Sequence, residues 1–349
     1  MIAFCLSLLA QPVHSKVKEE ENAINILHNE DNPLHIEILL EIIDITEING
    51  LSETFALDSY MILRWKDDTG ASTPQVYWNE SAQEKLSEVL PYLELNHRYE
   101  TREIMTSRLE VFATGEVMYS ERFHATLYSP FDLRSFPFDS QEFRIQVEAF
   151  HKPIQELQFT LRQNIPNNDY GAPGLLYYTD SRKPPESKEW KFEKTSSAIE
   201  VFQSPGTGNQ YSHAVFLISA KRLSGFYFWK VFLPLIIILA ISWSVFWMHG
   251  ESTVIPRVSL SMLGFLTTVS FGFFIGTNLP RVSYLTFMDS FLVGMYILVF
   301  LAVVEVLTTG FFIRTGKEAR ALLLNRRARW VFPVALLIHI LVVSLFFLT

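Results

Sequence analysis

The sequence predicts a two-part membrane protein: a β-sandwich over residues 16–222, then a transmembrane domain of four helices over residues 223–349. Segments that alternate polar and apolar residues fill the first part, and long apolar runs begin after Leu223. The charge changes sign at the same point. Nine basic and four acidic residues follow Leu223, which leaves 20 basic and 33 acidic residues before it. An acidic domain attracts cations and repels nucleic acid, so we expect no nucleic-acid partner.

Residues 1–15 resemble a short secretory signal, because an apolar stretch precedes a polar one, although no basic residue opens it. The alternative is a leader without a targeting role. Cys5 is the one cysteine of the chain, so the monomer has no disulfide and no cysteine-based metal site. We expect no metal and no other cofactor.

The first part has the pattern of a β-sandwich. Residues 141–150 alternate in polarity, with Phe143, Ile145 and Val147 on one face, and a period of two is typical of a half-buried strand. Other ranges with strand character are 35–48, 56–65, 117–128 and 214–221, with a hairpin tip at 204–209 and a short helix at 81–89. Many short strands separated by turns indicate a sandwich, here of about ten strands.

Four segments are long and apolar enough to cross a bilayer, which takes about 20 residues. They are residues 226–248, 258–275, 283–313 and 330–348. The connection 314–329 is strongly basic, so the positive-inside rule places it in the cytoplasm. Three helices precede this connection. The N-terminal domain is therefore expected on the extracellular or periplasmic side of a multi-pass protein of the cell membrane.

Residues 129–143 form the most specific motif, an Asp followed by Phe-Pro-apolar-Asp-x-Gln. The matching residues are Asp132, Phe136, Pro137, Phe138, Asp139 and Gln141. The motif resembles the signature loop of the Cys-loop receptor superfamily, the pentameric ligand-gated ion channels. Ser129 and Phe143 stand where the two cysteines of that family would be. Bacterial members typically lack the bridge, so the resemblance implies a channel of the prokaryotic type.

Further matches follow in the family's order and extend the resemblance from about residue 33 to the end of the chain. They are Trp65 and Asp67, Arg222, Pro234, and the turn from Asn278 to Pro280. The resemblance implies an immunoglobulin-like sandwich, a four-helix bundle and a homopentamer in lipid. A pentamer also fits the helix count, because one subunit has too few helices to enclose a pore.

The second apolar segment has the pattern of a pore-lining helix. One helical face carries Ser259, Leu263, Leu266, Ser270, Phe273 and Thr277, which follow one another at three- and four-residue steps. Five copies would surround an aqueous path with hydroxyl rings and with apolar rings that gate by dewetting. The resemblance implies that Leu266 is the central gate residue. The alternative is that the hydroxyls bond to neighbouring helices.

The ion preference depends on the residues at the start of this helix. Cation-selective relatives place a Glu just before the first basic residue, whereas Ile255 and Pro256 precede Arg257 here, which is more typical of anion-selective members. Glu251 is the candidate selectivity carboxylate upstream, and Arg257 is the candidate cation. The acidic outer domain favours cations. We expect cation conduction, with an anion-selective member of the same family as the alternative.

The resemblance implies an agonist site between subunits, within a group of aromatic side chains. The positions that match are Tyr60, Phe150 and Tyr211, with Glu41 where one relative has an aromatic residue. Aromatic faces suit an amine, since a cation over a ring gains roughly 0.5–2 kcal/mol. His151 next to Phe150, and His213 near Tyr211, make protons an alternative stimulus. Each aromatic residue is otherwise a candidate core residue.

Signal transfer from the sandwich to the helices needs contacts at their junction. The resemblance implies that Asp139 and Arg222 form a buried ion pair there, joined by Glu47, and that Pro280 rests against the cluster. Asp132, Phe136 and Pro137 belong to the same signature loop. Within the membrane, Asp289 and Glu305 are carboxylates that are costly to bury, which marks them as functional candidates or as members of ion pairs.

Two other functional classes fit the sequence less well. An enzyme would need a phosphate loop, metal-ligand spacing or a nucleophile elbow, and none is recognisable. A membrane sensory receptor without a pore would need an output domain, and residues 314–329 are too few to form one. The prediction is therefore a channel subunit that binds a small-molecule agonist or protons and conducts inorganic ions.

Overall fold

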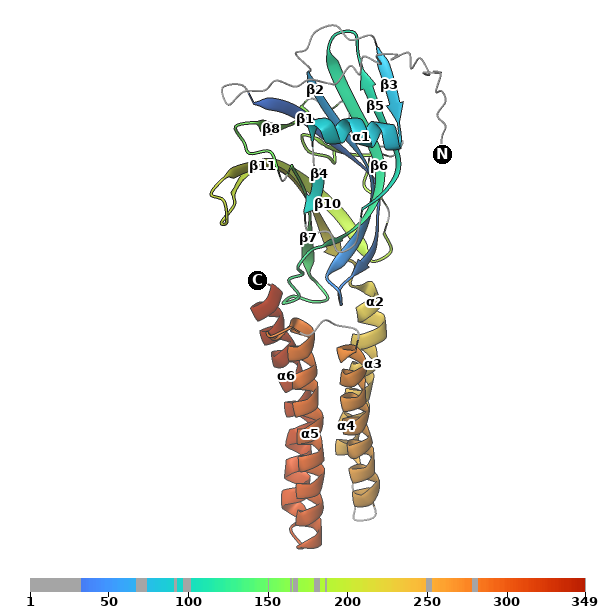
Figure 1. The fold of residues 1–349 in the computed structure, drawn as a ribbon. Coiled ribbons are helices and arrows are strands. Elements are labelled where there is room, and N and C mark those ends of the chain that lie inside the picture. The colour runs from blue at the N-terminus through green and yellow to red at the C-terminus, as the bar shows by residue number, and fades with distance from the viewer. Residues whose placement is uncertain are drawn as a thin grey trace, which may run out of the picture.

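The structure is a computed structural model. It describes residues 33–66, 74–90, 93–96, 102–149, 151–163, 165, 169–178, 183–185, 187–248, 253–277 and 282–348. A β-domain stands at one end of a bundle of four long helices (Figure 1). The last turns of α6 lie beside the loops at the base of this domain (Figure 1).

The larger sheet has the strand order β3-β5-β6-β2-β1-β8, and β9 also pairs with β1. Its strands are β1 (Leu34–Asn49), β2 (Thr54–Lys66), β3 (Gln75–Trp78), β5 (Glu103–Val111), β6 (Glu116–Tyr128), β8 (Leu157–Leu161) and β9 (Leu175–Tyr177). The long strands β2 and β6 alternate buried and less buried residues, as their sequence pattern predicts.

The smaller sheet has the order β10-β11-β7-β4. Its strands are β4 (Leu93–Asn96), β7 (Ser140–Ala149), β10 (Trp190–Gln203) and β11 (Gln210–Arg222). The predicted hairpin tip at 204–209 joins β10 to β11, and the predicted short helix is α1 (Glu80–Val89). Side chains from both sheets fill one core, with Phe55, Phe123 and Phe143 fully buried. The sandwich expected from the sequence is confirmed.

The first membrane helix runs from Gly225 to Trp247 and changes its winding. It comprises α2 (Gly225–Tyr227), a π-helical turn η1 (Phe228–Phe232), α3 (Leu233–Ser244) and a 3₁₀ turn η2 (Val245–Trp247). Pro234 is the second residue of α3, two positions after the end of the π-helical turn. Proline lacks an N–H donor, and irregular turns of this kind accommodate it within a continuous helix.

The other three helices are α4 (Val254–Gly276), α5 (Phe287–Arg314) and α6 (Glu318–Leu348). All four membrane helices are long and apolar enough to cross a bilayer. They differ in burial within the chain: the most apolar window is 44% buried in α5 but only 22% in α4 and 11% in α6. Large faces of α4 and α6 are therefore left for lipid, water or other subunits.

Three predicted helix bounds differ from the structure. α6 begins at Glu318, so most of the predicted connection 314–329 is helical, because Ala, Leu, Glu and Arg continue a helix beyond its apolar part. α4 begins at Val254, four residues early, since Pro256 is tolerated in a first helical turn. α5 begins only at Phe287, because Thr286 is its N-cap and forms a reciprocal capping box with Asp289 in the first turn.

Candidate functional site

The six predicted pore residues all lie on the exposed face of α4 within one subunit. Leu263, Leu266 and Phe273 are 60%, 63% and 74% exposed. The opposite face, with Ser261, Gly264 and Thr268, is buried against the rest of the bundle. The other three members of the exposed face are Ser259, Ser270 and Thr277. This face is amphipathic, with large apolar side chains between hydroxyls.

Two of the hydroxyls on this face bond to their own helix. Ser270 Oγ donates to the Leu266 carbonyl at 2.9 Å, and Thr277 Oγ1 donates to the Phe274 carbonyl at 2.8 Å. A hydroxyl has a single hydrogen to donate, so both of these donors are used locally. Within the described part of the subunit, the Ser270 hydroxyl therefore donates to its own helix and not to a neighbouring one, which was the alternative expectation.

A largely apolar groove of about 560 Å³ between α4 and α5 includes part of this face. It is lined by Ser259, Met262, Leu263, Phe265 and Leu266 of α4 and by Phe300 and Val303 of α5. Met262 and Phe300 are more than half exposed at its edges. An apolar groove of this size on a membrane helix is complementary to side chains of another helix.

Arg257, predicted as a selectivity residue, does not belong to the exposed face. It is 1% exposed and lies among α4, α5 and α6. Arg257 Nη2 donates to Asn325 Oδ1 at 2.8 Å and to Glu305 Oε2 at 3.3 Å. Thr309 donates to the other oxygen of Glu305 at 2.9 Å. Glu305, which was predicted to be either functional or a member of an ion pair, forms an ion pair with Arg257. The charge of Arg257 is thus balanced inside the subunit.

Asp139 and Arg222 form the predicted ion pair at the junction. Arg222 Nε and Nη2 donate to the two carboxylate oxygens of Asp139 at 2.8 and 3.1 Å. Gln141 Nε2 donates to the same carboxylate at 2.6 Å. The guanidinium lies 4.1 Å from the ring centre of Trp190 and 5.0 Å from that of Phe136. The pair is therefore enclosed by a hydrogen-bond donor and two aromatic faces.

The signature loop reaches from this pair to the membrane helices. The Phe287 N–H at the start of α5 donates to the Arg134 carbonyl at 2.8 Å, and the Leu133 N–H donates to Tyr284 Oη at 3.0 Å. Ser135 Oγ donates to the Phe347 carbonyl of α6 at 2.7 Å. One loop thus bonds to the segment just before α5, to the first residue of α5 and to the end of α6.

Other members of the loop have distinct positions. Asp132 pairs with Arg134 at 3.1 Å on the surface and exchanges backbone hydrogen bonds with the Gln141 side chain. Pro137 follows Phe136 through a cis peptide bond. Phe138 packs edge-on against Phe287 of α5, with ring centres 5.2 Å apart. Sequence reasoning missed Trp190, Tyr284 and Phe347, whose separation in the chain hides their proximity.

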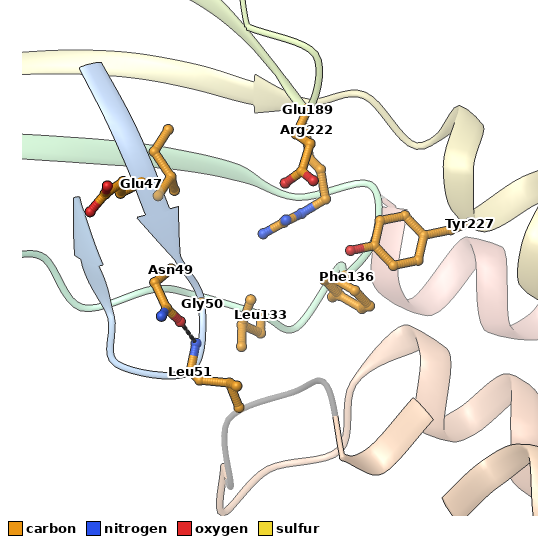
Figure 2. A pocket seen from close by; sticks show the side chains of 10 residues that line it. Glu47, Asn49, Gly50, Leu51, Leu133, Phe136, Glu189, Arg222 and Tyr227 are labelled. Carbon is orange, nitrogen blue, oxygen red and sulfur yellow. Dashed lines mark hydrogen bonds between the residues drawn. The ribbon is translucent and has the colours of Figure 1, made fainter. Parts of the chain in front are cut away.

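Glu47 lies across a cavity from the ion pair. The cavity measures about 350 Å³ and is lined by Glu47, Ile48, Asn49, Gly50, Leu51, Leu133, Phe136, Glu189, Arg222 and Tyr227. Figure 2 shows Glu47 on the β1–β2 side, with Arg222 and Tyr227 on the other. Within the described residues Glu47 forms no ion pair with Arg222. Glu47 therefore lies at the junction without a direct bond to the Asp139–Arg222 pair. The backbone turns at Glu47, where φ is 50°.

The predicted ligand residues form two sets on different sheets. Glu41 and Tyr60 face each other across β1 and β2, and the Tyr60 ring lies 5.2 Å from that of Tyr178. Arg122 lies 6.0 Å from the Tyr60 ring centre while bonding to Asp58. The sequence analysis missed Tyr178 and Arg122, although Arg122 is in register with Tyr60 once β2 and β6 are paired.

The second set lies on the smaller sheet. Tyr211 is on β11, and the exposed His151 follows β7. The Ile154 N–H donates to the Gln210 carbonyl at 2.7 Å, which holds the segment after His151 against the start of β11. Phe150, Glu251 and Pro280, the remaining predicted site residues, lie outside the described residues. Among the described residues, no three His, Cys, Asp or Glu side chains are placed to hold a metal ion.

Comparison with known proteins identifies both parts of the chain. Residues 17–222 match the neurotransmitter-gated ion-channel ligand binding domain, and residues 231–332 match the neurotransmitter-gated ion-channel transmembrane region. A proton-gated ion channel of Gloeobacter violaceus is 26% identical over 321 residues, covering 91% of this chain and 84% of that protein.

Two animal receptor subunits are also similar. A gamma-aminobutyric acid receptor subunit beta of Caenorhabditis elegans is 27% identical over 197 residues, 56% of this chain and 33% of that protein. A glycine receptor subunit beta of Rattus norvegicus is 27% identical over 213 residues, 61% of this chain and 40% of that protein. The matched region thus spans well under half the length of these two relatives.

Proposed function

The chain belongs to the neurotransmitter-gated ion-channel family, and on that premise we propose that it is one subunit of a homopentameric, ligand-gated, cation-conducting channel. It is a multi-pass membrane protein with an extracellular N-terminal domain, and its family comprises ion channels rather than enzymes. The observation that carries the proposal is the exposed, amphipathic face of α4.

A pore explains why this face is exposed. Lipid would favour an entirely apolar surface, whereas this face alternates hydroxyls with Leu263, Leu266 and Phe273. Five such faces around an axis provide polar rings for ions and apolar rings that hold the path dry when closed. The neighbouring subunit would cover the edge of the groove at Met262 and Phe300, and Ser259, Leu263 and Leu266 would stay on the side of the pore.

Cation conduction is supported by the placement of charge. The first part of the chain, up to Arg222, carries a net charge of −13, which concentrates cations at the outer entrance. Arg257 is buried and bonded to Glu305, so its positive charge is withheld from the conduction path. An anion-selective pore is the alternative, and the reversal potential in bilayer recordings distinguishes the two.

The ligand site is proposed to form where two subunits meet. One subunit would supply Glu41, Tyr60 and Tyr178, and its neighbour Tyr211 and His151. The aromatic rings suit a small amine, and the carboxylate of Glu41 adds charge complementarity. Protons are the second candidate stimulus, because the Gloeobacter relative is named a proton-gated channel.

Opening is proposed to pass through the signature loop. Movement of β7 or β11 displaces the Asp139–Arg222 pair, and Leu133, Arg134 and Ser135 deliver that displacement to α5 and α6 through hydrogen bonds. α4 packs against α5, so the pore helix moves with it. The ligand contributes only its difference in affinity for the closed and open states.

The test is single-channel recording from purified protein in planar bilayers, with a panel of small amines and with stepped external pH. We expect discrete currents, a fivefold particle in detergent, and a reversal potential that follows the cation gradient. If the reversal potential followed the chloride gradient, the proposal of a channel would stand, but the proposal of cation conduction would be wrong. A particle that assembles without conducting under any condition would favour a sensory receptor instead.

A further inference from the structure

A row of titratable side chains crosses the outer face of the smaller sheet. Glu94 of β4 is in register with Glu148 of β7, Glu148 with His213 of β11, and His213 with Glu200 of β10. In-register neighbours project from the same face. His213 in this row lies two residues along β11 from Tyr211, a member of the candidate ligand set.

The centre of this row is buried and closely bonded. The side chains of His213 and Glu148 are 5% and 12% exposed, with His213 Nε2 3.0 Å from Glu148 Oε2. Gln146 Nε2 lies 2.8 Å from His213 Nδ1. Phe202 stacks on the imidazole at 5.2 Å between ring centres. Together they form a closed side-chain tie between β7 and β11.

Arg144 determines where the hydrogens of this tie lie. It donates from Nε and Nη2 to Gln146 Oε1 at 3.3 and 3.1 Å, and also from Nη2 to Glu200 at 2.6 Å. A guanidinium only donates, so the Gln146 amide turns its oxygen to Arg144 and its NH₂ to His213. Nδ1 of His213 therefore accepts, and Nε2 carries the hydrogen and donates to Glu148.

A further proton is accordingly better accommodated on Glu148 than on His213. A second N–H on the imidazole would face the NH₂ of Gln146, donor against donor. Burial lowers the pKa of His213, and Arg144 lowers it further, although Glu200 acts in the opposite direction. Burial raises the pKa of Glu148 and the neighbouring Glu94 carboxylate raises it further, although a hydrogen bond from the Gln146 side chain acts in the opposite direction.

We infer that the carboxylate of Glu148, held by His213, is a proton-binding site whose occupation loosens the connection between β7 and β11. A proton from the solvent binds one Glu148 oxygen, and His213 keeps its Nε2 hydrogen. The charge-assisted hydrogen bond becomes a neutral one, which is about half as strong. The consequence for ligand binding rests on the proposed function, because β11 carries Tyr211 and the 204–209 turn.

The test uses the full-length protein and a fluorophore on that turn. In a Cys5→Ser background, Thr207→Cys provides a single labelling site next to β11. On acidification we expect one fluorescence transition with its midpoint above 4.5, the usual value for Glu. Glu148→Gln mimics the protonated state, so its signal should stay at the acid plateau at every pH. Difference infrared spectra should show a protonated-carboxyl band with the same midpoint, absent from Glu148→Gln.

Two further variants keep the outcome decisive. Glu142→Gln removes an exposed carboxylate from the same face of β7 and should retain the transition. Glu94→Gln removes the neighbouring negative charge, so the midpoint should move to lower pH even if Glu148→Gln does not fold. A wild type without a transition, a transition that persists in Glu148→Gln, or a midpoint that Glu94→Gln leaves in place would overturn the inference. Neither readout needs an open channel, so a protein that titrates but never conducts refutes the proposed function alone.

Discussion

Arg222, the last residue of β11, holds both carboxylate oxygens of Asp139, the residue before β7, at 2.8 and 3.1 Å. Their side chains are 9% and 1% exposed, so the two strands leave the sandwich joined by a desolvated ion pair. Replacing one member of such a pair strands the other charge and costs about 3–5 kcal/mol.

We therefore expect Asp139→Asn to lower the thermal stability of the purified assembly strongly, as followed by loss of the oligomer peak in size-exclusion chromatography. The double variant Asp139→Leu with Arg222→Met should recover much of the loss, because no charge is then stranded. The exposed pair of Asp132 and Arg134 is the control, and Asp132→Asn should change stability by less than about 1 kcal/mol. Equal losses for Asp139→Asn and Asp132→Asn would contradict the buried-pair account.

Leu266→Ser should ease opening, since a hydroxyl ring wets the constriction that leucine keeps dry. The expected result is a lower half-maximal stimulus concentration, or current without stimulus, in recordings from cells or bilayers. Leu337→Ser on α6 is the matched control, because Leu337 is 66% exposed against 63% for Leu266. If both variants respond like the wild type, Leu266 is not the gate.

Arg257→Gln should leave ion selectivity unchanged while lowering the yield of assembled protein. The arginine charge is bonded to Glu305 and Asn325 inside the subunit, so its removal changes little in the pore but leaves Glu305 without its cation. Reversal potentials in asymmetric salt measure the first effect, and chromatographic yield the second. A changed permeability ratio would show that the charge of Arg257 acts on the permeant ions after all.

A ligand site shared between subunits predicts rescue by mixing. Tyr60→Ala and Tyr211→Ala should each reduce the response strongly in homomeric channels. Co-expression of the two variants places an intact Tyr60 set beside an intact Tyr211 set at some interfaces, so part of the response should return. Dose–response curves for the two single variants and their mixture provide the measurement. A mixture that behaves like the weaker single variant would place the site within one subunit.

Glu121 gives a signed prediction for stability against pH. Burial raises its pKa, and the opposing effects of Arg102 and Tyr119 do not cancel the rise. The folded state therefore binds this proton more tightly than the unfolded state. The group's stabilising contribution is complete below pH 4.5 and is lost as the pH rises through the raised pKa.

The measurement is the difference in melting temperature between the wild type and Glu121→Gln at several pH values. As the pH rises, the wild type should lose melting temperature relative to Glu121→Gln, and the corresponding loss of unfolding free energy is at most about 1.4 kcal/mol per pH unit. Glu103→Gln, at the exposed start of β5, supplies the baseline for a carboxylate lost from the same sheet. A difference that is constant over this range would show that Glu121 does not titrate there.

The strands and the exposed face of α4 were predictable because their signals are local. The strand predicted at residues 141–150 is β7, and its observed bounds differ from the predicted ones by one residue at each end. The prediction succeeds because neighbouring side chains on a strand alternate between core and surface. The six residues from Ser259 to Thr277 share a face because the helical period places them there. No contact with a distant segment is needed for either result.

Other features depend on partners that are far apart in the chain. Arg257 meets Glu305 and Asn325 across separations of 48 and 68 residues, so its burial could not be inferred from the residues around it. The start of α6 was misplaced because hydropathy reports the part of a helix that suits lipid, not the part that is helical. The tie between Glu148 and His213 needs the register of β7 and β11.

The hydrogen bond from Ser135 to the Phe347 carbonyl has a mechanical consequence. Of the four membrane helices, α6 has the least buried apolar window, and its outer end is attached to the loop that also carries Asp139. A helix whose apolar length differs from the bilayer thickness tilts to compensate. Any such tilt moves the attached end of α6 sideways. The thickness of the surrounding membrane would then act on the same signature loop through which opening is proposed to pass.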